Sequence, residues 1–221
     1  MKTRFDYLNE MDINTEWLNR SIDNSSLTNP KKKSLASLKD EVSDCNKCML
    51  ASTRDKIVFG SGSLESKLMI IGEAPGKDED LMGEPFVGRA GKLLDEILFS
   101  MSLTRENVYI TNTVKCRPPQ NRNPLIEEIE SCSDYLNQQI RNINPRVIIL
   151  LGKVAANRML GSEEPISELR QKIFNHHLTN TPMIVFYHPA YLLRSPSQKK
   201  QMWYDIKYTL KYIKENDCTI N

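Results

Sequence analysis

Apolar and polar positions follow two patterns along the chain. Four short runs are almost continuously apolar and rich in β-branched residues, at residues 67–74, 107–114, 146–152 and 182–189. Such runs predict buried strands. Between and after them, apolar residues recur at helical spacing, which predicts helices over residues 91–101, 124–143, 153–161 and 198–216. Strands separated by helices indicate an α/β fold with a parallel sheet covered on both faces.

The first 36 residues follow neither pattern. They are polar, and residues 23–34, "DNSSLTNPKKKS", have the composition of a linker. Residues 34–45, "SLASLKDEVSDC", predict a helix at the start of the regular pattern. We therefore divide the chain into a polar N-terminal arm, residues 1–36, and a folded domain, residues 37–221.

Composition narrows the class of protein. Of the 221 residues, 39% are hydrophobic and 26% charged, which is typical of a soluble globular protein with one core. The formal net charge of +2 gives no overall basic field, so any binding of nucleic acid must come from local patches. The sequence contains no apolar run long enough for a membrane span and no secretory signal. We expect a cytoplasmic protein that has no membrane partner.

Polar loops follow three of the four predicted strands, at residues 72–91, 112–123 and 188–195. The carboxyl ends of parallel strands lie at one edge of a sheet, and ligands of open α/β sheets bind beyond that edge. These loops are therefore expected to converge on an active site.

The cysteines indicate a metal site. Of the five, Cys45 and Cys48 form a C-x2-C pair, whereas fifteen residues separate Cys116 from Cys132. Zinc, iron–sulfur clusters and redox dithiols all use C-x2-C, and dispersed ligands suit an iron–sulfur cluster best. The alternative is four unrelated buried thiols. Cys218 has no partner in the sequence pattern and is interpreted as an incidental thiol.

Four motifs stand in order with these cysteines: "GEAPGKDED" (72–80), "GEPFVGRAG" (83–91), "NTVKCRPPQNRNP" (112–124) and "HPAYLLR" (188–194). With them, the chain resembles the family 4, iron–sulfur uracil-DNA glycosylases from about Cys45 to Arg194. The resemblance implies a three-layer α/β/α fold with a four-stranded parallel sheet and the excision of uracil from DNA. It also implies a [4Fe-4S] cluster, with no redox step, on these ligands: Cys45, Cys48, Cys116 and Cys132.

The same resemblance implies roles for three side chains in the base pocket. Phe86 matches the aromatic residue that stacks on uracil. Asn112 matches the base-reading asparagine, whose amide accepts from uracil N3–H and donates to O4. His188 matches the histidine that donates to uracil O2 as negative charge builds up on the leaving base.

Glu73 is the second catalytic candidate. By resemblance, it faces the sugar together with the backbone of Gly72 and Ala74. It either positions the attacking water or stabilises an oxocarbenium-like transition state by its charge, and both roles stay open. The best-known uracil glycosylases carry an aspartate at the place of Ala74 and a thymine-excluding tyrosine at the place of Gly76, so the rejection of thymine is not predicted.

Basic residues on these loops are expected to contact DNA phosphates: Lys115, Arg117, Arg122 and Arg194. Leu192 is expected to wedge into the duplex where the base has left, with Leu193 as the alternative.

The resulting hypothesis is a monofunctional, monomeric uracil-DNA glycosylase of base excision repair that leaves an abasic site in uracil-containing DNA. One alternative is a uracil- or DNA-binding iron–sulfur module of the same fold without turnover. Another, a structural metal-bound interaction domain, leaves Phe86, Asn112 and His188 unexplained. The N-terminal arm is a candidate contact for repair or replication partners.

Overall fold

A computed structural model describes residues 33–216 and residue 218, so most of the predicted N-terminal arm lies outside the described residues. Its centre is a sheet in the order β1-β3-β2-β4-β6-β5. The inner strands are parallel: β2 (Leu68–Gly72), β3 (Val108–Asn112), β4 (Val147–Leu151) and β6 (Pro182–Phe186). The four-stranded parallel sheet predicted from the sequence is confirmed.

Two short edge strands extend this sheet. They are β1 (Ser61–Gly62), which pairs antiparallel with β3, and β5 (Phe174–Asn175), which pairs antiparallel with β6. Neither was predicted, because two-residue strands are too short to leave an alternating pattern in the sequence.

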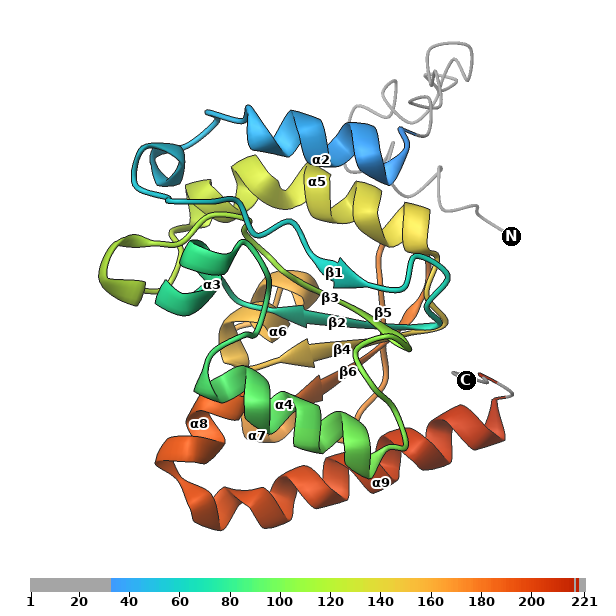
Figure 1. Cartoon of the computed structure of the whole chain (residues 1–221). Coiled ribbons are helices and arrows are strands. Elements are labelled where there is room, and N and C mark those ends of the chain that lie inside the picture. Colours follow the sequence, from blue (N-terminus) through green and yellow to red (C-terminus); the bar gives the residue numbers. More distant parts are fainter. Residues whose placement is uncertain (1–32, 217, 219–221) are drawn as a thin grey trace, which may run out of the picture. The chain divides into compact units, whose positions relative to one another are not determined.

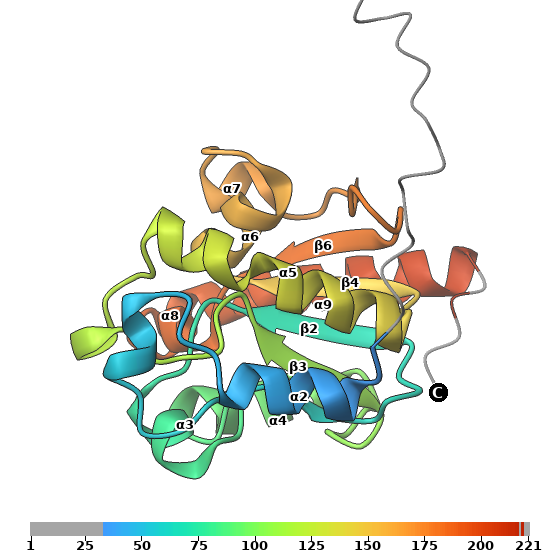
Figure 2. The ribbon, with the colours of Figure 1, turned by 90° about the horizontal axis from the view of Figure 1, so that it is seen from above.

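Helices form the outer layers (Figures 1 and 2). On one face, α4 and α9 pack against the sheet; on the other, α5 and α6 do, and α2 lies against α5. Their bounds are α2 (Leu35–Ser43), α3 (Lys77–Met82), α4 (Arg89–Ser100), α5 (Ile126–Ile143), α6 (Lys153–Leu160), α7 (Ile166–Leu169), α8 (Pro189–Arg194) and α9 (Lys199–Glu215). The described residues also form three 3-10 turns: η1 (Met49–Ser52), η2 (Pro119–Asn121) and η3 (Pro196–Gln198). None of the described helices has the length and apolarity needed to cross a membrane.

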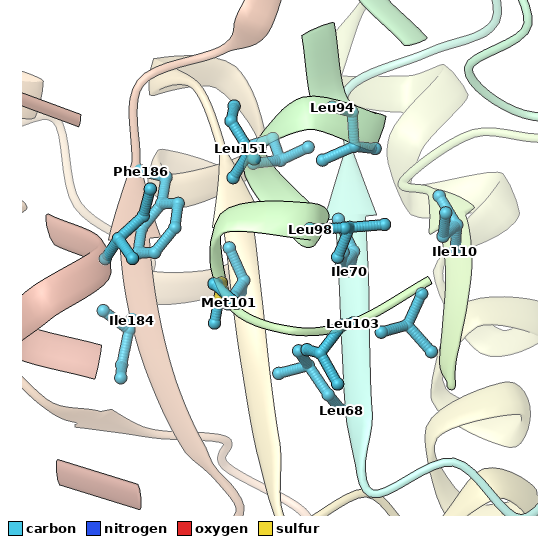
Figure 3. Close-up of a cluster of buried hydrophobic side chains, with 14 of the residues drawn as sticks. Leu68, Ile70, Leu94, Leu98, Met101, Leu103, Ile110, Leu151, Ile184 and Phe186 are labelled. Atoms are coloured by element: carbon cyan, nitrogen blue, oxygen red, sulfur yellow. The ribbon is translucent and has the colours of Figure 1, made fainter. Parts of the chain in front are cut away.

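Strand β2 is buried on both faces. Leu68 and Ile70 belong to the core cluster that contains Leu94 of α4 (Figure 3), whereas Met69 and Ile71 belong to the cluster on the α5 side. Each fully buried side chain of this kind contributes about 1.5–3 kcal/mol to folding. A one-residue slip would exchange the two faces, so packing on both sides fixes the register of the sheet.

The connections create a crevice at one edge of the sheet. From β2 the chain continues to β3 on one side, and from β4 it continues to β6 on the other, although β2 and β4 are neighbours. The loops at the carboxyl ends of β2 and β4 therefore diverge, which is the geometry in which open α/β sheets bind ligands.

Candidate active site

A cleft of about 740 Å³ opens at this edge. It is lined by residues from the loops that follow all four inner strands, and it brings together Glu73, Phe86, Asn112 and His188. The four residues were candidates from the sequence, where the first and the last are more than a hundred positions apart, and the fold places them around one cavity.

Asn112 ends β3 and pairs in register with Gly72, the last residue of β2. Its side chain is only 1% exposed, yet its Oδ1 atom has no hydrogen-bond partner. A Cβ atom at Gly72 would collide with this oxygen and with the Phe86 ring, so glycine leaves the space that the two side chains occupy. A buried acceptor without a partner costs about 1–3 kcal/mol, which a ligand donor can recover.

Phe86 is held in an unusual backbone conformation. Its φ of +55° lies in the left-handed region, which bulky residues rarely adopt. Arg105 donates to the carbonyl oxygens of Pro85, at 3.0 Å, and of Phe86. Gly91 lets α4 pass directly against the Phe86 carbonyl group, where a Cβ atom would clash. These contacts fix the ring, whose centroid lies 5.6 Å from that of His188.

His188 is the N-cap of α8, and its Nδ1 accepts a hydrogen bond of 3.1 Å from the Ala190 backbone N–H. A neutral imidazole that accepts at Nδ1 carries its proton on Nε2. Burial, with a smaller effect from the charge of Arg194, lowers the pKa of His188 to about 4. The ring is therefore neutral at pH 7, with Nε2–H as its donor. Gly152, at φ +90°, makes room for its Cβ atom.

Glu73 is half-buried at the end of β2, and burial raises the pKa of its carboxyl group to about 6. Its carbonyl oxygen accepts from the Thr113 hydroxyl at 2.5 Å and from the Val114 N–H at 3.4 Å. The backbone of the first loop is thus tied to the chain that follows β3, and the carboxylate lines the cleft.

Glu79 joins two loops of the site, a role that sequence analysis missed. Its carboxylate accepts from the backbone N–H groups of Gly76 (3.1 Å), Val87 (2.9 Å) and Gly88 (3.0 Å). The last two follow Phe86 directly. In the sequence, only the glycines at 76 and 88 hint at such a link, because a carboxylate can approach backbone N–H groups closely where side chains are small.

The position of Lys115 contradicts its predicted role in DNA binding. It was expected to contact DNA, but its side chain is fully buried, and its Nζ donates to Thr111 Oγ1 and to the Asn112 carbonyl oxygen, both at 2.7 Å. The chain turns into the interior after β3 instead of forming a surface loop. A buried ammonium group cannot reach a phosphate in this structure, so the prediction for Lys115 is wrong.

The other basic residues lie at or near the rim. Arg122 and Arg194 line the cleft and are exposed. Arg122 forms a bidentate pair with Glu128, at 2.9 and 2.6 Å, and Arg117 donates to Asn121 at 2.8 Å. Phosphate contacts by these arginines stay predictions, and the partners of Arg117 and Arg122 hold the guanidinium groups in place.

The position of Leu192 contradicts its predicted role as the duplex wedge. It was the first choice for the duplex wedge, but it is 1% exposed and packs in the cluster of α4 and α9 with Met202 and Ile206. Helix α8 is so short that its apolar side is needed to attach it to the core. Leu193, the alternative, is half-buried and is the better candidate.

The predicted metal ligands lie in one layer, between α2, η1 and α5. Cys116 and Cys132 belong to a hydrophobic cluster, and Cys45 and Cys48 pack against it. Burial, and to a smaller extent the charges of Cys48 and Cys45, raise the pKa of the Cys116 thiol. The four residues, called the cysteine group below, are close enough to interact electrostatically.

Two cations, Arg54 and Lys115, lie beside the cysteine group. Arg54 donates to Cys116 Sγ at 3.2 Å. The backbone N–H of Lys115 donates to Cys132, and its ammonium group interacts electrostatically with Cys132 and Cys116. Burial lowers the pKa of the Lys115 ammonium group to about 8, although the charges of Cys132 and Cys116 act to raise it. Hydrogen bonds and nearby charges of this kind tune thiolate-bound clusters.

The described residues contain no group of three or more histidine, cysteine or acidic side chains placed to hold a metal ion. In a [4Fe-4S] cluster, however, each cysteine binds a different iron, so the thiols surround a volume and do not converge on one point. The cysteine group, with its two cations, fits such a cluster better than a single ion.

One wall of the cleft was not predicted from the sequence. Tyr187 and Tyr191 line it, with ring centroids 5.0 Å apart. The Arg170 guanidinium group lies 4.3 Å from the Tyr187 ring and forms a buried ion pair with Asp205, at 2.7 Å. This ion pair between Arg170, which follows α7, and Asp205 of α9 thus supports the strand end that carries His188. No local motif marks this support, because its members are 35 residues apart in the sequence.

Comparisons with known proteins agree with this geometry. Residues 59–207 match the family model described as the uracil DNA glycosylase superfamily. A type-4 uracil-DNA glycosylase of Archaeoglobus fulgidus is 43% identical over 181 residues, which cover 79% of this chain and 91% of the relative. One of Saccharolobus solfataricus is 40% identical over 189 residues (82% and 88%), and one of Thermotoga maritima is 40% identical over 179 residues (80% and 93%).

Proposed function

Because this chain belongs to the uracil-DNA glycosylase superfamily and, within it, to the type-4 enzymes, we propose that it hydrolyses the N-glycosidic bond of deoxyuridine in DNA. The products are free uracil and an abasic site, which places the reaction in base excision repair. The base must leave the stack to reach the cleft, at a cost of a few kcal/mol that contacts in the pocket offset.

The unpaired Oδ1 atom of Asn112 is the observation that carries this proposal. Uracil N3–H supplies the missing donor, and the Asn112 amide donates to uracil O4. Cytosine presents an acceptor at N3 and would leave Oδ1 unpaired, which costs about 1–3 kcal/mol. Phe86, fixed beside Asn112, stacks on the base and contributes about 1–3 kcal/mol.

His188 stabilises the leaving base. Its neutral ring donates from Nε2 to uracil O2, and this bond strengthens as negative charge moves from the sugar to the base. One preorganised donor of this type lowers the barrier by about 2.7–4 kcal/mol. The pKa of about 4 keeps the ring neutral throughout the physiological range, so it acts as a hydrogen-bond donor.

Glu73 serves the sugar side, where the backbone of Gly72 and Ala74 completes the wall. With a pKa of about 6, its carboxyl group is ionised at pH 7. The carboxylate orients the attacking water and stabilises positive charge on the sugar ring. Arg117, Arg122 and Arg194 contact the DNA backbone, and Leu193 fills the space that the base has left.

We further propose that Cys45, Cys48, Cys116 and Cys132 hold a [4Fe-4S] cluster. When bound, the cluster braces the loops around the site, and it takes no part in electron transfer. Support comes from the packing of the four thiols in one layer with Arg54 and Lys115. We also propose that the enzyme is a cytoplasmic monomer built from residues 37–221, with residues 1–36 available to repair or replication partners.

The test uses single-stranded oligonucleotides that contain one uracil, incubated with the iron-containing protein and then treated with alkali. We expect strand scission at the uracil and none in the matched oligonucleotide with cytosine. Binding without scission would favour the module without turnover and would contradict the enzymatic proposal.

A further inference from the structure

Helix α9 concentrates the positive charge of the chain. Between Lys199 and Glu215 it contains five lysines against two acidic residues, a net charge of +3, whereas the whole chain has +2. One of the acidic residues, Asp205, is buried and paired with Arg170. The remainder of the chain therefore has a formal net charge of −1, so α9 accounts for the net positive charge of the chain.

Four of the five lysines lie on one side of the helix together with two aromatic rings. At about 100° per residue, one arc of about 100° contains six residues: Lys200, Trp203, Tyr204, Lys207, Lys211 and Lys214. We call this set the α9 stripe. Its members are exposed, including 49% of Trp203 and 38% of Tyr204, while the opposite side of α9 packs in the core.

Contacts within the α9 stripe orient its aromatic rings. Lys207 Nζ lies 4.6 Å above the Tyr204 ring. Trp203 borders a hollow of about 150 Å³ between α4 and α9, lined by Leu93, Leu192 and Met202. Lys211 is 3.7 Å from Glu215, but both side chains are well exposed, so this pair is weak.

The stripe starts beside the cleft. Arg194, which lines the cleft, ends α8, and η3 connects it directly to the first residue of α9. In Figure 1, α8 and the beginning of α9 lie together, and α9 runs from there along the edge of the molecule. A strand that leaves the cleft past Arg194 therefore meets Lys200 and Trp203 next.

We propose that the α9 stripe binds the unpaired DNA strand that flanks the deoxyuridine, with lysines on phosphates and Trp203 and Tyr204 stacked on bases. The proposal rests on the proposed function, because the flank is defined by a nucleotide in the cleft. Lys200, Lys207 and Lys214 are seven residues, or about 10.5 Å, apart. A strand that runs along α9 therefore meets these three lysines in succession.

The aromatic rings favour a single strand over a duplex. Unpaired bases expose faces on which Trp203 and Tyr204 can stack, whereas paired bases are already stacked on each other. The stripe would then supply binding energy away from the reacting bond. It should lower KM for long single-stranded substrates and leave kcat unchanged.

Tryptophan fluorescence gives a direct test. The chain has two tryptophans, so a Trp17→Phe variant leaves Trp203 alone. We expect a uracil-free oligothymidylate to quench Trp203 in this variant, while vesicles of anionic lipid do not. Quenching needs no excision, so it distinguishes a failure of this proposal from a failure of the proposed enzymatic activity. Absence of quenching by DNA, or quenching by vesicles instead, would overturn the proposal.

Two double variants separate the stripe from general charge. Lys200→Gln with Lys207→Gln, in the same background, should weaken oligothymidylate binding about fivefold per lost contact at 0.1 M salt and reduce the salt slope by about 1.4. Lys39→Gln with Lys67→Gln removes the same charge from exposed positions on α2 and before β2. Equal effects of the two pairs would contradict a specific site.

Kinetics complete the test. With the wild-type Trp17, the stripe variant should raise KM for a long uracil oligonucleotide, while kcat and the KM for an oligonucleotide with only two nucleotides on each side stay unchanged. Extending the short oligonucleotide on its 5′ or its 3′ side identifies the flank that the stripe binds. An equal rise in KM for both lengths would overturn the proposal.

Discussion

The base pocket and the cysteine group differ in the charges that surround them. In the pocket, the Asn112 side chain is uncharged and the His188 ring is neutral. The buried Oδ1 atom of Asn112 has no hydrogen-bond partner. In the cysteine group, burial raises the pKa values of the Cys116 and Cys132 thiols, and two cations, Arg54 and Lys115, lie beside these thiols. The pocket is therefore prepared for a neutral base, whereas the cysteine group is prepared for an anionic partner.

The two regions meet in one short segment. Asn112 and Cys116 are four residues apart, and Lys115 between them donates to the carbonyl oxygen of Asn112. Lys115 thus holds the backbone of Asn112, while its charge interacts with the thiols of Cys132 and Cys116. The pocket can be altered without touching the cysteine group, but changes in the cysteine group are expected to reach the pocket through this segment.

Replacement of Asn112 should have the largest effect and should stay within the pocket. We expect Asn112→Ala to lower kcat/KM for uracil DNA by about 10³-fold, about 4 kcal/mol, because both base-reading hydrogen bonds disappear. The melting temperature should not fall, since the substitution removes a buried unpaired acceptor. Asn123→Ala, at the exposed rim of the same cleft, is the matched control and should be nearly neutral.

Loss of the His188 donor ranks second. We expect His188→Ala to lower kcat by about 10²–10³-fold, with a smaller change in KM, because the bond to O2 matters most in the transition state. Losing the cap of α8 should cost about 1 kcal/mol of folding stability, measurable by thermal melting. His177→Ala, at an exposed position, is the control. A rise in KM alone would contradict the assigned role of His188.

The sequence predicted the pocket well because its parts follow strong signals. Continuous apolar runs located β2, β3, β4 and β6, and the polar loops after three of them contained Glu73, Phe86, Asn112 and His188. Parallel strands bring such loops together whatever their separation in the chain.

Two other positions, Lys115 and Leu192, were harder to predict. Lys115 has the residue type of a surface contact, and only the buried thiols and carbonyl group around it show why it points inward. Leu192 stands in a polar motif, but the attachment of the short helix α8 to α4 and α9 requires it in the core. Tertiary packing buries both side chains, and no local pattern of the sequence indicates that burial.

Cys116 tests whether the cysteine group supports the pocket. We expect Cys116→Ser to lose iron, lower the melting temperature and reduce kcat/KM by about 10²-fold, the size of effect that a displacement of about 1 Å produces in an active site. Iron content is measured alongside activity. Cys218→Ser, outside the cysteine group, should change none of these quantities. Full activity of an iron-free Cys116→Ser protein would show that the two regions are independent.

The smallest expected effect is the change of kcat with pH. It distinguishes Glu73 from His188, because the two side chains titrate at different pH. Burial raises the pKa of Glu73 to about 6, so at pH 5 only about a tenth of it is ionised, and kcat should fall about tenfold per pH unit below 6. His188, with a pKa of about 4, stays neutral over this range.

The same titration affects folding stability. Because the carboxyl pKa of Glu73 is higher in the folded than in the unfolded chain, it stabilises the fold at pH values below the unfolded-state pKa, and this stabilisation is lost as pH rises through 6. Activity and the Glu73 contribution to stability should therefore change in opposite directions between about pH 4.5 and 6. Glu73→Gln should be slower and should lose the acid limb of the rate profile; a limb that persists near pH 6 in this variant would assign the titration to another group.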